Sequence, residues 1–314
     1  MAAPDYARLI DAEMRAFIRT TSGFGTDDPD IPAQRAAYDA MCRHFHAGRP
    51  EGVAVQDGAE GDVPVRHYLP GAPRATLVYY HGGGFVVGGL HSHDDICAEI
   101  AVRCGVRVVS VDYRLAPEHP HPAAFEDACT AFRAVATQRG DPLLLAGDSA
   151  GGNLAAAVAH ATRHDGKRAC GQILIYPGLG GDADRGSYLE HAQAPLLSRA
   201  DVLQYGLLRA GDAEALAGLR TDPAAAPLRD ADFSALPATA IFAAQCDPLV
   251  DDSRDYAARL RAAGVSVQLT VEPGLVHGYL RARHLSAKAR GSFDRICAAI
   301  NALAGATGTA ATAG

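Results

Sequence analysis

The chain has 314 residues, of which 48% are hydrophobic, and this length suits one large domain of the α/β kind. The formal net charge at pH 7 is −7 and no run of lysine or arginine occurs, so nucleic acid is not an expected partner. We expect a soluble cytoplasmic protein without stable membrane insertion, because no apolar stretch is long enough to cross a bilayer, the amino terminus lacks a secretion signal and the seven cysteines form no Cys-x-x-Cys motif.

Two helices are predicted before any strand. Apolar residues recur at helical spacing from Tyr6 to about Phe17, and a second helical stretch runs from about Pro32 to His46 after a break rich in Gly, Asp and Pro. We expect residues 1–50 to form cap helices over a catalytic domain at 51–305. The alternative is a pair of helices that packs at the edge of the domain.

A glycine-rich motif follows the first predicted strands. Segments starting at Val53 and Val63 are rich in strand-forming residues and are separated by an Asp-Gly turn, which predicts an antiparallel pair. The buried strand Ala75 to Tyr80 then ends in His81-Gly-Gly-Gly84-Phe85. Consecutive glycines let backbone N–H groups approach a ligand that side chains would block, as in an oxyanion hole.

The run His91-Ser-His93-Asp-Asp95 is a candidate metal site because histidine and aspartate cluster there. It lacks the third histidine of a binuclear zinc motif, and no Cys/His pairs with ligand spacing occur elsewhere. We therefore expect no metal or other cofactor, and interpret the run as the solvated start of a helix with aspartate caps.

The most informative stretch is Gly147-Asp-Ser149-Ala-Gly-Gly152, which joins a buried strand to an Ala-rich helix that begins at Ala150. A Gly-x-Ser-x-Gly motif at a strand-to-helix turn is typical of a nucleophile elbow. The small neighbours let strand and helix pass closely, and the turn holds the serine hydroxyl out into a cleft.

Beyond this motif, strands and helices alternate. The predicted elements are a strand over 172–176, an insertion of helical fragments over 178–236, a strand over 238–244, a helix that stops at Gly264, a strand over 265–271, a helix from about Leu285 and a disordered tail at 306–314. The alternation predicts a mostly parallel sheet covered by helices on both faces. Insertions as long as 178–236 are usually lids or binding loops, so this segment is assigned to the cap.

Three residues at the ends of predicted strands form a candidate catalytic triad. Ser149, Asp247 and His277 occur in the chain order expected for α/β-hydrolases. In this arrangement the histidine removes the serine proton and the aspartate orients the imidazole. His284 is rejected because it lies in or beside the last helix. Asp251 and Asp252 are rejected because they lie at the start of the helix that follows Asp247, where capping explains them better.

The chain resembles the hormone-sensitive-lipase-like carboxylesterases, the bacterial group IV esterases of the α/β-hydrolase fold. The resemblance is carried by His81-Gly-Gly-Gly84, Asp112-Tyr-Arg-Leu-Ala-Pro-Glu118, Gly147-Asp-Ser-Ala-Gly-Gly152, Asp247-Pro-Leu249 and His277-Gly278. It implies the triad given above, with an oxyanion hole made by the backbone N–H groups of Gly83, Gly84 and Ala150. Tyr279 departs from the more usual phenylalanine after His-Gly.

The resemblance implies a serine hydrolase that cleaves small esters with short to medium acyl chains through an acyl-enzyme intermediate. Hydrolysis of amides or peptides by the same triad is one alternative, and a ligand receptor without catalysis is another. Such receptors lack a working triad histidine, whereas His277 is present here. The expected partner is a small ester, and a homodimer is one assembly left open.

Overall fold

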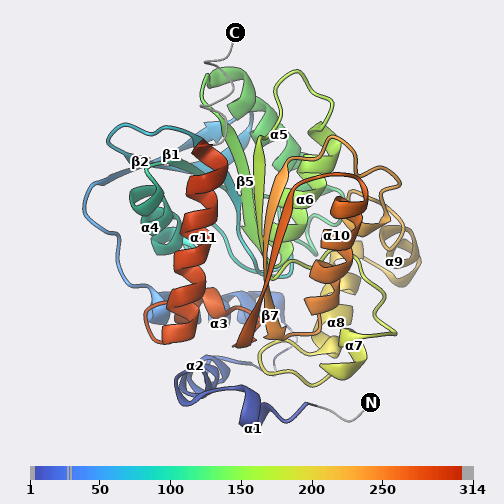
Figure 1. The fold of residues 1–314 in the computed structure, drawn as a ribbon. Coiled ribbons are helices and arrows are strands. Elements are labelled where there is room, and N and C mark those ends of the chain that lie inside the picture. Colours follow the sequence, from blue (N-terminus) through green and yellow to red (C-terminus); the bar gives the residue numbers. More distant parts are fainter. Residues whose placement is uncertain (1–3, 27, 29, 306–314) are drawn as a thin grey trace.

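The computed structural model describes residues 4–26, 28 and 30–305. The predicted disordered tail at 306–314 lies outside the described residues. The described chain forms one eight-stranded sheet, shown in Figure 1, with strand order β1-β2-β4-β3-β5-β6-β7-β8. The strands are β1 (Val53–Glu60), β2 (Val63–Pro70), β3 (Thr76–Tyr80), β4 (Arg107–Val111), β5 (Leu143–Asp148), β6 (Gly171–Ile175), β7 (Ala238–Cys246) and β8 (Val267–Val276).

The sheet is mostly parallel, as predicted. The strands β4, β3, β5, β6, β7 and β8 are parallel, and β2 joins β1 and β4 by antiparallel pairing. The carboxyl ends of the parallel strands therefore meet at one edge, where catalytic groups of α/β folds collect. The turn of the β1–β2 pair is at Gly61, with φ of 67°, and not at Asp57-Gly58, because β1 continues through that dipeptide.

Helices cover both faces of the sheet, as predicted. They are α1 (Tyr6–Leu9), α2 (Ala12–Ser22), α3 (Ile31–Phe45), α4 (Asp94–Cys104), α5 (Ala123–Gln138), α6 (Ala150–Thr162), α7 (Ser187–Glu190), α8 (Arg199–Ala210), α9 (Ala213–Leu219), α10 (Val250–Ala262) and α11 (Ala287–Gly305), with 3₁₀ turns η1 (Pro227–Arg229) and η2 (Tyr279–Ala282). Leu285, expected in the last helix, lies before α11 and is exposed. No helix in the described ranges is both long and apolar enough to cross a membrane.

Alternation along the strands divides the core into two layers. On β3, Leu77 and Tyr79 pack in the layer that holds α4 and α11, whereas Val78 and Tyr80 pack in the layer that holds α5, α6 and α10. Successive strand residues point to opposite faces, so a buried central strand needs apolar side chains at every position. This is why the uninterrupted apolar runs of the sequence predicted the strands well.

The predicted first helix is two helices. Ile10 leaves the helical conformation, and the Asp11 side chain accepts a hydrogen bond from the Met14 N–H at 2.9 Å to start α2. Ile10, Met14 and Phe17 are all buried in the layer of α4 and α11. The helical spacing of apolar residues predicted the buried face correctly. It did not predict the interruption of the helix at Ile10, before the cap residue Asp11.

The start of α4 is buried, and the interpretation of Asp94 and Asp95 as solvated caps was wrong. Asp94 is 5% exposed and accepts hydrogen bonds from Arg49, Arg66 and the Tyr68 hydroxyl. Burial opposes the charge, but hydrogen bonds from Arg49, Tyr68 and a histidine outweigh it and lower the pKa of Asp94 to about 2. This carboxylate fastens the loop after α3 to β2 and α4.

We expect Asp94→Asn to lower the free energy of unfolding by about 3 kcal/mol at pH 7, because two arginines lose their buried partner. The folded-state pKa is depressed, so this stabilisation is present above about pH 4 and is lost as the pH falls toward about 2. Urea unfolding at pH 7 and at about pH 2.5 measures both effects. Asp57→Asn is the matched control, since Asp57 also pairs with Arg66 but is exposed, and it should cost less than about 1 kcal/mol. Equal losses in the two variants would contradict the assignment.

Candidate active site

Ser149 lies at the sharp turn between β5 and α6, with φ of 55° and ψ of −118°. This conformation is unusual for a residue with a side chain and marks local backbone strain. A Cβ on Gly147 would overlap the carbonyl oxygen of Gly151, and a Cβ on Gly151 would overlap that of Tyr80. The two glycines therefore let α6 approach β5 and β3 closely enough to form the turn.

The structure brings Ser149, Asp247 and His277 together at the carboxyl ends of β5, β7 and β8. His277 Nε2 lies 2.8 Å from Ser149 Oγ, and His277 Nδ1 lies 2.7 Å from Asp247 Oδ2. Asp247 is fully buried, and its other oxygen accepts a hydrogen bond from the Leu249 N–H at 2.9 Å. The imidazole thus links a buried carboxylate to a hydroxyl at a cavity.

The rejected acids have a different role from the one expected. Asp252 is buried and accepts hydrogen bonds from the Leu179 and Gly181 N–H groups, while Asp251 accepts one from the Ser187 N–H. Neither caps α10, so the capping interpretation was wrong. Burial raises the pKa of Asp252 to about 6 despite these hydrogen bonds. Both carboxylates fasten the start of the 178–236 segment to α10.

His284 lies away from the triad. Its Nε2 is 3.0 Å from Glu99 Oε2, and its side chain is exposed. His284 lies just before α11, which agrees with the sequence argument that it is not in a strand-end loop.

The glycine loop provides backbone N–H groups next to Ser149. Gly83 and Gly84 have φ of 134° and 60°, and both line a cavity with Ser149 and His277. In the described chain, the N–H groups of Gly83, Gly84 and Ala150 donate to no recorded acceptor. A Cβ on Gly83 would overlap the Val87 carbonyl oxygen, so only glycine fits this turn.

A buried polar network beneath the loop was missed by sequence reasoning. Asp148 accepts hydrogen bonds from the Gly82 N–H at 3.0 Å and the Tyr79 hydroxyl at 2.8 Å, and its second oxygen lies 3.2 Å from His93 Nε2. Burial opposes the charge, but His93 and Tyr79 outweigh it and hold the pKa of Asp148 well below its ordinary value. The sequence offers His93 only as a candidate metal ligand. No local pattern links it to Asp148, which is 55 positions away.

The imidazole of His81 lies beside this network and stacks on His93 with ring centres 5.9 Å apart. It stacks on Tyr113 with ring centres 4.3 Å apart, and the Tyr113 hydroxyl donates to the His81 carbonyl at 2.6 Å. Burial lowers the pKa of His81 to about 3, so the ring is neutral at physiological pH. The proline-rich stretch that contains Tyr113 therefore supports the glycine loop from behind.

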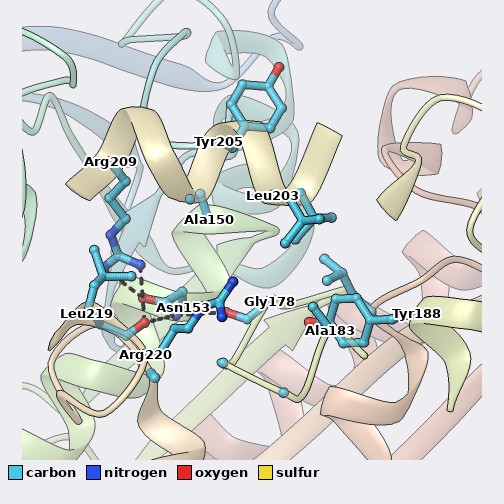
Figure 2. Close-up of a pocket in the computed structure, with 18 of the residues that line it drawn as sticks. Ala150, Asn153, Gly178, Ala183, Tyr188, Leu203, Tyr205, Arg209, Leu219 and Arg220 are labelled. Carbon is cyan, nitrogen blue, oxygen red and sulfur yellow. Dashed lines mark hydrogen bonds between the residues drawn. The ribbon is translucent and has the colours of Figure 1, made fainter. Parts of the chain in front are cut away.

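Two cavities meet at Ser149. The first, called here the α8 cavity, has a volume of about 230 Å³ and lies under α8 and α9 (Figure 2). The second, called the amino-terminal cavity, has a volume of about 210 Å³ and is lined by Phe17, Thr21, Tyr38 and Met41 together with His277. The amino-terminal helices thus line the second cavity only, whereas the 178–236 segment lines both, with Leu196, Leu197 and Tyr205 in the second.

The two segments also touch each other. The Tyr6 hydroxyl lies 2.9 Å from His191 Nδ1, which joins the residues of α1 to the segment 178–236. Figure 1 shows α1 and α2 beneath the end of the sheet at which β7 and β8 meet the site. Together these elements cover the carboxyl edge of the sheet.

Comparison of the sequence with known families and proteins gives a consistent result. Residues 77–281 match the family described as alpha/beta hydrolase fold. The chain is 44% identical to the carboxylesterase NlhH of Mycobacterium tuberculosis over 70% of this chain and 72% of that protein, and 35% identical to the carboxylic ester hydrolase LipN of the same species over 93% and 83%. It is 36% identical to an ethyl acetate hydrolase of Pseudomonas putida over 70% and 72%.

Solved structures show the same similarity. A bacterial heroin esterase superposes with a TM-score of 0.85 at 31% identity, covering 94% of this chain and 98% of that one. An esterase from the bacterial hormone-sensitive lipase family superposes with a TM-score of 0.84 at 26% identity, covering 94% and 99%.

The buried network generates a prediction for the glycine loop. We expect Asp148→Ala to lower the free energy of unfolding by about 3 kcal/mol, because the Gly82 N–H and the Tyr79 hydroxyl lose their acceptor in a buried site. Hydrogen exchange of the amides of residues 82–84 should also become faster. Asp148→Asn keeps one acceptor oxygen. It should therefore show a smaller loss of unfolding free energy and a smaller increase in the exchange rate. If urea unfolding and exchange were the same for both variants and the wild type, the network would not hold the loop.

Proposed function

Because the chain belongs to the hormone-sensitive-lipase-like carboxylesterases of the α/β-hydrolase fold, we propose that Ser149, His277 and Asp247 carry out its ester hydrolysis. The observation that carries this proposal is the continuous chain of two short contacts, 2.7 and 2.8 Å, from the buried Asp247 through His277 to Ser149. The strained conformation of Ser149 adds support, since such strain clusters at functional sites.

The geometry suits a two-step mechanism. His277 Nε2 accepts the proton of Ser149 Oγ as this oxygen attacks the ester carbonyl, and Asp247 stabilises the imidazolium through Nδ1. Collapse of the tetrahedral intermediate breaks the bond to the alcohol, which leaves with the proton from His277. Water then attacks the acyl-enzyme in the same way, giving its proton to His277, and this proton returns to Ser149 as the acid is released.

We assign the oxyanion hole to the N–H groups of Gly83, Gly84 and Ala150. These three groups lack another recorded acceptor in the described chain and lie around Ser149, and Ala150 is the first residue of α6. The positive end of the α6 dipole adds to the stabilisation of a negative oxygen.

We further propose that residues 1–50 and the segment 178–236 act as two parts of a cap that limits substrate size. Residues of both parts line the amino-terminal cavity, and the segment 178–236 also lines the α8 cavity. Volumes of about 230 and 210 Å³ favour short to medium acyl chains and small alcohols. The similarity to an ethyl acetate hydrolase favours the same size class.

The compartment proposed for this enzyme is the cytoplasm. All seven cysteines lie within the described residues and are free thiols, six of them buried, which is typical of proteins from a reducing environment. Assembly as a homodimer and hydrolysis of amides by the same triad stay alternatives that the sequence leaves open.

We expect Ser149→Ala to lower kcat for a short p-nitrophenyl ester by on the order of 10⁶, because the nucleophile is lost. Thermal unfolding should change little, since alanine tolerates the same backbone and one hydroxyl at a cavity contributes little stability. The exposed Ser266→Ala is the control and should keep wild-type turnover. Turnover near the wild-type value in folded Ser149→Ala would exclude this serine as the nucleophile.

The proposed oxyanion hole depends on the backbone N–H group of Gly83. We expect Gly83→Ala to lower kcat by about 10² to 10³ with a much smaller change in KM, because the interaction with the oxyanion is made chiefly in the transition state. Gly105→Ala is the matched control, since Gly105 also has positive φ but a Cβ there meets no atom within 4 Å. Circular dichroism checks the fold, and an unchanged kcat in a folded Gly83→Ala would sink the oxyanion-hole assignment.

A further inference from the structure

Arg209, near the end of α8, is a buried cation in the wall of the α8 cavity. It is 6% exposed, and it lines this cavity together with Ser149 and Ala150. Figure 2 shows its side chain extending from α8 towards Asn153 on α6. The residue was not singled out by any sequence motif, and the proposed mechanism does not use it.

In the described part of the chain no carboxylate forms an ion pair with this guanidinium. Asp222 is near enough to favour its charge, but that carboxylate is paired with His121 at 2.8 Å. Arg209 donates to the Ala225 carbonyl at 3.1 Å and to Asn153 Oδ1 at 3.3 Å, and its guanidinium carbon lies 3.6 Å from the ring centre of Phe85. A buried cation without a counter-ion is costly. Burial lowers the pKa of Arg209 to about 9, so the group is still charged at neutral pH.

The other charged groups around the cavity leave it positive. Asp182 and Asp184 line its rim, but each is paired with an arginine, Arg185 and Arg199 respectively. Arg220 and Arg229 also line the cavity, and neither has an ion-pair partner among the described residues. Among the described residues, one buried arginine and two exposed arginines thus line this cavity without an ion-pair partner, in a chain whose formal net charge is −7.

The guanidinium is connected to the turn at Ser149 through Asn153. Asn153, which it contacts, lies one turn along α6, and its N–H donates to the Ser149 carbonyl at 3.1 Å. One helical turn is about 5.4 Å. A group only a few bonds from the reacting ester carbonyl could therefore meet Arg209.

We propose that the α8 cavity recognises a carboxylate carried by the ester substrate, and that Arg209 is the residue that binds it. The guanidinium has five N–H donors, of which two make the recorded contacts, and its planar fork matches a carboxylate. The inference rests on the proposed function, since it names the substrate class of the same site: half-esters of dicarboxylic acids, or acyl esters of hydroxy acids.

The test compares charged and neutral esters of equal length. Monomethyl glutarate carries a carboxylate on the acyl side and is paired with methyl pentanoate, while 3-acetoxypropanoate carries it on the alcohol side and is paired with propyl acetate. The wild type should show a higher kcat/KM for the charged member of at least one pair, and that pair shows which side of the ester enters the cavity. A preference for the neutral member of both pairs would overturn the proposal.

The variant Arg209→Met should lower kcat/KM for the preferred charged ester by about 10- to 100-fold relative to its neutral partner, the range expected for a charge-assisted hydrogen bond. Arg259→Met is the matched control. Arg259 also lies over an aromatic ring, Phe233 at 4.1 Å, and donates to a backbone carbonyl, but it does not line the cavity. In Arg259→Met the ratio of kcat/KM for the charged ester to kcat/KM for the neutral ester should stay at the wild-type value. Equal losses on both esters in Arg209→Met would show a structural role only and overturn the proposal.

A binding measurement separates this proposal from the proposed catalytic residues. Glutarate should bind to Ser149→Ala in titration calorimetry, and the added substitution Arg209→Met should weaken binding by a similar 10- to 100-fold. This readout does not depend on turnover. Absence of glutarate binding in folded Ser149→Ala would count against the carboxylate site, whereas full turnover of that variant would count against the triad.

Discussion

The close approach of α6 to β5 and β3 is the constraint on which the site depends. Gly147 and Gly151 have no room for a Cβ, since backbone oxygens of neighbouring residues occupy the space. Only this contact allows the turn that holds Ser149 at φ of 55° and places Ala150 at the amino-terminal end of α6. The hydroxyl and the positive end of the helix therefore reach the same point for one structural reason.

Asp148 connects this turn to the glycine loop. Its backbone belongs to β5, next to Ser149, whereas its carboxylate holds the Gly82 N–H and contacts His93 at the start of α4. Ser149, the proposed nucleophile, and the glycine loop beside it are thus positioned through adjacent residues. A buried carboxylate with partners on both oxygens, as Asp148 has, favours one arrangement of the core over its alternatives.

The two segments proposed to form the cap bring different side chains to the cavities. The amino-terminal helices contribute largely apolar or aromatic walls, such as Phe17 and Met41, whereas the segment 178–236 brings Arg209 to the other cavity. Asp251 and Asp252 fasten the beginning of that segment to α10 through backbone N–H groups. These hydrogen bonds hold the beginning of the segment 178–236 close to Asp247, one of the proposed catalytic residues.

The sequence by itself determined the fold class, the strand runs and the candidates Ser149, Asp247 and His277, because each depends on a local pattern: apolar runs for buried strands, small residues around a turn, and polar residues directly after strands. The tertiary structure alone decided the rest. It showed that Asp94 is a buried ion-pair centre, that His93 supports the glycine loop and that Arg209 faces the cavity beside Ser149. These roles depend on side-chain partners 26 to 56 positions apart, such as Asp148 for His93 and Asn153 for Arg209. They also depend on burial, which is a property of the packed chain and leaves no periodic signal in the sequence.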